Sequence, residues 1–253
     1  ALVFEDVPKE KYKNSHEYFL KLAKKVTKKL NTIGYEHCPA DMMASNKKWC
    51  LSLTEWKQQF DNWIKHPDED KIMLCTIFFD YDLIYGNKTL VEEMSDSIFD
   101  SIDKYEIFLN FLGLNALKNP PPLSFFRQFL VEDTGEHKDQ FDIKARAMMP
   151  LVDSARLLVL SKNIKDHNNT ILRLEKLAEE EPQNKELFTS CVNAFKVLLR
   201  FRTNQGIKHN DSGRFIDLKS LTKDDRLKLK GCFKPIKDIQ ELIKVRFKLS
   251  QML

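Results

Sequence analysis

Several features that would assign this chain to a special class are missing from its sequence. No apolar run approaches the roughly 18–20 residues that a membrane-spanning helix needs, and no secretory pattern opens the chain. Its five cysteines form no C-x-x-C pair, and no paired histidine motif accompanies them, so neither a disulfide framework nor a zinc site is expected. We therefore expect a cytoplasmic protein with no membrane partner, whose reduced thiols pack as small apolar groups.

A strong excess of one charge is missing as well. The 41 lysines and arginines nearly balance the 37 aspartates and glutamates, which leaves a formal net charge of +4. Non-specific binding to a phosphate backbone needs a concentrated basic face, so we expect no nucleic-acid partner. The apolar share of 42% and the charged share of 31% are typical of an ordinary globular protein, long enough at 253 residues for two domains.

Helical periodicity is the main local signal. Residues 9–33 carry apolar side chains at steps of three and four, with lysines on the other face, which predicts an amphipathic helix. Residues 45–64 predict a second helix, whose tryptophans form a packing stripe. In the second half, a capping-box pattern from Thr222 to Asp225 fixes the start of the last helix. The helices predicted there cover 142–161, 168–180, 184–205 and 222–250.

Two segments mark the organisation of the chain less directly. Residues 71–85 are mostly apolar, and their periodicity fits a buried strand or a buried helix. Further on, Asn119 is followed by three prolines, whose missing amides rule out a helix interior. We place a domain boundary there, between residues 1–118 and 119–253.

Asp80 and Asp82 are candidate metal ligands because they stand two residues apart. On a strand both carboxylates would emerge on one face, about 7 Å apart, and could share a Mg²⁺ that bridges substrate phosphates. On a helix they would diverge. The alternative is that one aspartate caps the turn at Gly86 and the other is solvated.

Leu2, Val3 and Phe4 read as a core strand entered part-way, which suggests a fragment. Together with residues 38–46 and 77–87, these first residues resemble a nucleotidyltransferase family related to the PII uridylyltransferases. In that family an acidic pair that holds the catalytic metal lies just upstream of such a strand. The resemblance therefore implies that the chain is inactive as it stands, and that the intact enzyme uses Mg²⁺.

The resemblance also implies roles for single residues. Asp80 matches the family's aromatic-aromatic-Asp segment and Asp41 is a second acidic candidate, so both are expected to be catalytic, while Ser45 and Asn46 lie in a closely matching piece and are expected to bind substrate. The chain departs from the family where Asp82 replaces the usual Arg. It also has Asn87 for Asp and Ala40-Asp41 for a Gly-rich pair.

The helical half places charged groups on apolar stripes, where an unpaired guanidinium would cost several kcal/mol. Internal pairs, such as Arg156 with Asp153, are the favoured interpretation. The other interpretation is that four arginines converge on an anionic ligand. Its substrate-binding candidates are Arg156, Arg173, Arg200, Arg202 and, on the same stripe as Arg202, Gln205. The segments that carry these residues also resemble the helical domain that follows the transferase domain in the family. In the family, that domain is expected to bind the substrate.

Together these features predict an α+β fold that is mostly α, with part of a nucleotidyltransferase-fold domain followed by a helical bundle. The resemblance implies a signalling protein, since relatives often carry cyclic-nucleotide-binding and CBS modules. It would transfer a nucleotidyl group from a nucleoside triphosphate to a protein or small-molecule acceptor. The alternative is a non-catalytic regulatory module that binds a nucleotide or a partner and has a degenerate active site. The acceptor, the base and the oligomeric state stay open.

Overall fold

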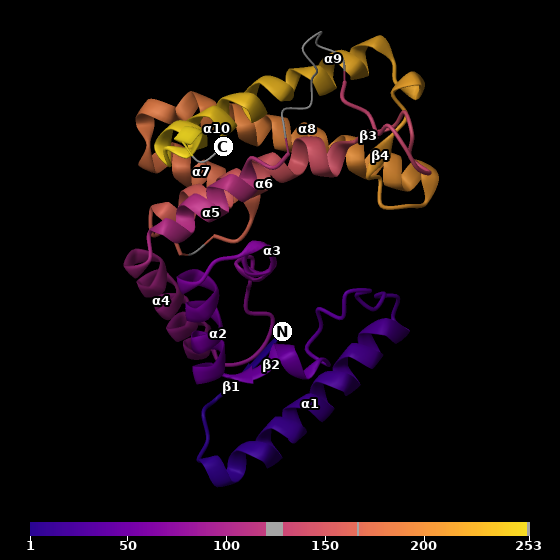
Figure 1. Cartoon of the computed structure of the whole chain (residues 1–253). Coiled ribbons are helices and arrows are strands. Elements are labelled where there is room, and N and C mark those ends of the chain that lie inside the picture. The colour runs from indigo at the N-terminus through magenta and orange to yellow at the C-terminus, as the bar shows by residue number, and fades with distance from the viewer. Residues whose placement is uncertain (120–128, 166, 252–253) are drawn as a thin grey trace. The chain divides into compact units, whose positions relative to one another are not determined.

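The computed structural model describes residues 1–119, 129–165 and 167–251, and in them the predicted mostly helical α+β fold is confirmed (Figure 1). The chain divides into two compact units. The N-terminal unit contains Ala1–Pro67 and Asp82–Tyr105, and the helical unit contains Asp68–Tyr81 and Glu106–Leu253. The chain therefore enters the helical unit twice. None of the described helices is long and apolar enough to cross a membrane.

The N-terminal unit is built around a short parallel strand pair. Strand β1 (Leu2–Phe4) pairs with β2 (Cys50–Ser52), with Leu2 opposite Cys50 and Phe4 opposite Ser52. Helix α1 (Lys9–Thr32) lies between them in the chain, and its Phe19 stacks on Phe4 at a centroid distance of 5.0 Å. The predicted core strand and first helix are thus confirmed, and Phe4 is buried.

Helix α2 (Leu53–Lys65) begins later than the expected residue 45, because the preceding residues form a 3₁₀ turn (Lys47–Trp49) and β2. Ser52 sets the start through a capping box with Glu55, in which each side chain accepts from the other residue's amide. The predicted packing stripe is confirmed. Its tryptophans are buried together with Phe60. Helix α4 (Lys88–Lys104), which Asn87 caps, packs against α2.

The ambiguous segment 71–85 is helical in its first part. Helix α3 (Glu69–Phe78) starts where the side chain of Asp68 accepts from the amide of Lys71, and such a cap favours a helix over a strand. Helix α5 (Ile107–Ala116) follows in the helical unit. The prolines of the expected boundary fall within residues 120–128, outside the described residues, so the division at residue 118 stays a prediction.

Helix α6 (Met149–Ser161) is buried on nearly all sides and contacts α5, α7 and α10. A π-helical turn (Lys144–Met148) leads into it. The other elements are α7 (Thr170–Glu180), α8 (Lys185–His209), α9 (Lys223–Gly231), α10 (Phe233–Arg246), the antiparallel strands β3 (Phe141–Asp142) and β4 (Phe215–Ile216), and 3₁₀ turns at Pro182–Asn184, Leu218–Ser220 and Leu249–Gln251.

The single helix predicted over 222–250 is wrong, because the structure divides it into α9 and α10 at Cys232. Pro235 accounts for the break: it has no amide to donate to the carbonyl of Gly231, and its ring would clash there. The predicted start is confirmed in part. The hydroxyl of Thr222 accepts from the amide of Asp225, while the carboxylate of Asp225 accepts from that hydroxyl rather than from a backbone amide.

A buried ion pair connects the end of α7 to the end of α10. Arg246 donates through both terminal nitrogens to the two oxygens of Glu181, at 2.8 and 2.6 Å, and the Glu181 side chain is 1% exposed. Burial acts to raise the pKa of Glu181, but hydrogen bonds from Arg246 and Asn184 prevail and lower it to about 2.

Candidate functional site

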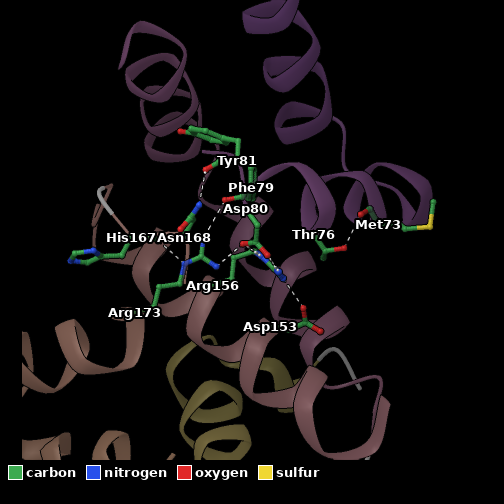
Figure 2. Close-up of polar contacts among 10 residues, drawn as sticks. All are labelled: Met73, Thr76, Phe79, Asp80, Tyr81, Asp153, Arg156, His167, Asn168 and Arg173. Carbon is green, nitrogen blue, oxygen red and sulfur yellow. Dashed lines mark hydrogen bonds and ion pairs between the residues drawn. The ribbon is translucent and has the colours of Figure 1, made fainter. Parts of the chain in front are cut away.

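Asp80 lies in the turn that follows α3, and its carboxylate faces two arginines of the helical bundle (Figure 2). Arg156 of α6 donates through Nε to Oδ1 of Asp80 at 3.0 Å and through Nη2 to Oδ2, which is a bidentate fork. Arg173 of α7 donates through Nη1 to Oδ1 at 2.6 Å. Two guanidiniums from different helices thus share one carboxylate.

Arg173 also holds the backbone around Asp80. Its Nη2 donates to the carbonyl oxygen of Phe79 at 3.2 Å, and its Nε donates to that of His167 at 2.7 Å. The side-chain amide of Asn168 donates to the carbonyl oxygen of Tyr81 at 3.3 Å. Residues 79–81 are therefore attached to the bundle through both side chain and main chain.

Arg156 has a second carboxylate partner on its own helix. Its Nη1 donates to Oδ1 of Asp153 at 2.6 Å, so the internal pair favoured on sequence grounds is confirmed. We call Asp80, Asp153, Arg156 and Arg173 the charge cluster. Within it, the side chains of both arginines and of Asp153 are 3–7% exposed, whereas that of Asp80 is 33% exposed. Solvent therefore reaches the cluster mainly at Asp80.

The pKa values of the two carboxylates in the charge cluster shift in opposite directions. Burial acts to raise the pKa of Asp80, but the hydrogen bonds and charges of Arg156 and Arg173 prevail and lower it. For Asp153 burial is the stronger influence and raises the pKa, even though Arg156 opposes it. Burial also lowers the pKa of Arg173 despite the nearby Asp80.

The two predicted arginines of α8, Arg200 and Arg202, form none of the described hydrogen bonds of the charge cluster. Arg200 is exposed, and Arg202 donates through Nε to the carbonyl oxygen of Ser212 at 3.1 Å, in the turn after α8. Gln205 is buried on the same helix. Substrate roles for these three stay predictions.

Asp41 and Asn46 lie in the N-terminal unit and contact each other. The amide of Asn46 donates to Oδ2 of Asp41 at 2.9 Å, and its oxygen accepts from the amide of Lys48. Asp41 has a φ of 52°, in the left-handed region that glycine adopts most easily. That conformation fits the Gly-rich pair that the resemblance places here. Ser45 precedes Asn46 in the same turn.

The residues around Asp80 do not fit a magnesium site. Asp80 and Asp82 follow a helix and lie outside any strand, so the geometry proposed for a shared ion does not arise. Asp82 is exposed and accepts from the amide of Leu83, and both oxygens of Asp80 face guanidiniums, whose charge repels a cation. Among the described residues no group of three or more His, Cys, Asp or Glu is placed to hold a metal.

Sequence reasoning identified Arg156 and Arg173 as candidates but missed their shared partner. Asp80 lies 76 and 93 positions from them, so no local pattern links the three. His167 and Asn168 were missed as well. The one nearby signal is Asn169, whose side chain caps α7 and so fixes where the loop carrying His167 and Asn168 ends.

Comparisons with known families identify both parts of the chain. Residues 106–247, more than half of the chain, match the family described as "Putative nucleotidyltransferase substrate binding domain", and residues 1–70 match "Putative nucleotidyltransferase DUF294". The chain therefore belongs to this nucleotidyltransferase family, as its sequence resemblance indicated. No curated protein and no solved structure matches the chain. Asp153, Arg156 and Arg173 fall inside the substrate-binding match, and Asp80 lies between the two matched regions.

Proposed function

We propose that this chain is part of a signalling nucleotidyltransferase whose helical unit binds the nucleotide through Arg156 and Arg173. In such a reaction, an acceptor hydroxyl on a protein or small molecule attacks a nucleoside triphosphate, and pyrophosphate leaves. The observation that carries the proposal is the convergence of two buried guanidiniums on the one carboxylate of the charge cluster that solvent reaches. Planar guanidinium forks match the oxygens of phosphate as well as those of carboxylate.

The role of these arginines would be binding and charge neutralisation. A triphosphate held by two forks loses its freedom to reorient, and the positive charges stabilise oxygens that gain charge during transfer. Mg²⁺ is expected for the intact enzyme, but the described residues offer it no ligand set. We therefore assign the arginines no part in metal chemistry.

A triphosphate titration tests the proposal. Replacing Arg173 with methionine keeps much of the apolar stem but removes the fork, so binding of a nucleoside triphosphate should weaken by about 1.5–3 kcal/mol. Arg246→Met is the matched control, because it removes a comparable ion pair with Glu181 in the same unit. That variant should lose stability and keep the affinity. Calorimetric titrations and thermal melts of the three proteins give both quantities, and equal affinities would contradict the proposal.

A second candidate is a non-catalytic module that binds a nucleotide or a partner and has a degenerate active site. Two observations favour it: Asp82 replaces the family's usual arginine and is exposed, and the part of the chain described here holds no cluster of metal-binding side chains.

Under either function, we expect that residues 1–253 alone neither transfer nor hydrolyse nucleotides, because the residues that the structure describes gather too little negative charge to hold Mg²⁺ against a triphosphate. Incubation of the purified chain with labelled nucleoside triphosphates, with and without a chelator, measures this. Incorporation or hydrolysis that the chelator abolishes would show that the chain holds an active site elsewhere.

A further inference from the structure

The charge cluster is electrically balanced. Its two guanidiniums face two carboxylates, and each of the three donor positions of both arginines, Nε, Nη1 and Nη2, already has an acceptor. An added anion would therefore find no spare positive charge, and every guanidinium nitrogen is already engaged, although each terminal nitrogen has a second N–H. Replacing the carboxylate of Asp80 would give a phosphate both the positive charge and the fork of Arg156 that now faces Asp80.

Asp80 is the carboxylate that can be replaced. Its side chain is 33% exposed, against 7% for Asp153, so an anion from solvent meets it first and water can solvate it once it is displaced. Asp80 also lies in a turn, whereas Asp153 lies inside α6, where the helix backbone fixes its position. The exposed carboxylate thus occupies the position that an anionic ligand would take.

Displacing the carboxylate of Asp80 would also disturb the hydrogen bonds that hold the backbone of its turn. Arg173 also binds the carbonyl of Phe79, and the next residue, Tyr81, is bound by Asn168. If Arg173 reorients toward a phosphate, its hydrogen bond to the carbonyl of Phe79 weakens or breaks. Directly after Tyr81 the chain passes into the N-terminal unit at Asp82.

We propose that Asp80 is a built-in competitor: the phosphates of a bound nucleotide replace its carboxylate on Arg156 and Arg173, and the turn at residues 79–81 loosens as a result. The inference rests on the proposed function of the two arginines and adds to it a response to ligand. Binding at the charge cluster thereby changes the segment through which the chain leaves the helical unit.

Affinity for inorganic tripolyphosphate, which carries no base, tests the competition. Asp80→Asn keeps the shape of the side chain but removes its charge, so the forks are free for the ligand in a larger fraction of molecules. We expect this variant to bind tripolyphosphate about tenfold or more tightly than wild type. Asp82→Asn, at an exposed carboxylate two residues away, is the matched control and should leave the affinity unchanged. Unchanged or weaker binding by Asp80→Asn would overturn the inference.

Hydrogen exchange on the wild-type chain tests the response without any substitution. With saturating tripolyphosphate, a peptide covering residues 76–82 should exchange faster, by about tenfold in its slowest amides, because the turn is held less firmly. A peptide from α2 serves as the control and should not change. Slower or unchanged exchange over residues 76–82 would overturn the inference.

The two proposals can fail separately. If Arg173→Met weakens nucleotide binding but Asp80→Asn does not strengthen tripolyphosphate binding, the arginines bind ligand and the competition is wrong. If neither wild type nor Asp80→Asn binds tripolyphosphate or a nucleotide, the proposed function and the competition both fail.

Discussion

Asp80→Ala should lower the free energy of unfolding by about 3–5 kcal/mol, the usual cost of leaving buried charge without its partner. The substitution removes the shared acceptor of Arg156 and Arg173, whose side chains are only 3% and 4% exposed. Asp82→Ala removes an exposed carboxylate two residues away and should change stability by no more than about 0.5 kcal/mol. Denaturant unfolding of the three proteins measures both effects. Equal stability of the two variants would contradict the structure of the charge cluster.

The contribution of Asp80 should also depend on pH in a defined direction. Its pKa is lowered in the folded chain from a reference value of 3.8, so the unfolded chain takes up this proton first. The stability that Asp80 supplies is therefore fully present above about pH 4 and is lost as the pH falls further. Asp153 acts in the opposite sense, because its raised pKa makes the folded chain bind the proton more tightly. Accordingly, the difference in stability between wild type and Asp80→Asn should shrink below pH 4, and a constant difference would contradict this assignment.

Gly213→Ala should cost about 3–5 kcal/mol, as backbone strain and a steric clash combine. Gly213 has a φ of 62°, and a Cβ added there would lie 1.9 Å from the carbonyl oxygen of Arg202 and 2.8 Å from the amide nitrogen of Gly206. Both are backbone atoms and cannot turn aside as a flexible side chain would. The turn after α8, which Arg202 also holds through Ser212, would have to open.

Gly135→Ala is the control for that prediction. Gly135 also has a positive φ, of 80°, but an added Cβ would meet nothing within 4 Å. It should therefore show only the conformational penalty of the left-handed region, about 1–2 kcal/mol. Thermal or denaturant unfolding of both variants separates strain from clash. Equal losses at the two glycines would show that the chain around Gly213 adjusts freely.

The elements that sequence reasoning predicted well are those that depend on local signals. Helix α1 follows from its periodicity, and the start of α9 follows from the pattern at Thr222. The start of α2 carries a local signal too, the capping box of Ser52 and Glu55, but the prediction missed it and began the helix at residue 45. That residues 50–52 form a strand could not be predicted locally, because it depends on pairing with β1. The segment 71–85 stayed ambiguous, because an apolar run has the same pattern in a buried strand and a buried helix.

In the charge cluster, too, the contact within one helix could be predicted and the contact between distant segments could not. The pair between Arg156 and Asp153 could be predicted, since residues three apart on one helix face each other. The position of Asp80 could not, because it depends on how the turn after α3 packs against α6 and α7. Sequence reasoning instead paired Asp80 with Asp82, and that geometry required a strand that the chain does not form.

The most direct test of the account is to observe the arginines themselves while a nucleotide binds. Arginine side-chain Nε–H signals of the wild-type chain can be followed by NMR during titration with a nucleoside triphosphate, with Arg156→Met and Arg173→Met used to assign the two signals. If Arg156 and Arg173 bind the phosphates, their signals shift and saturate together, while that of Arg246, paired with Glu181, stays in place. Saturation with nucleotide that leaves the signals of Arg156 and Arg173 unmoved would contradict this role.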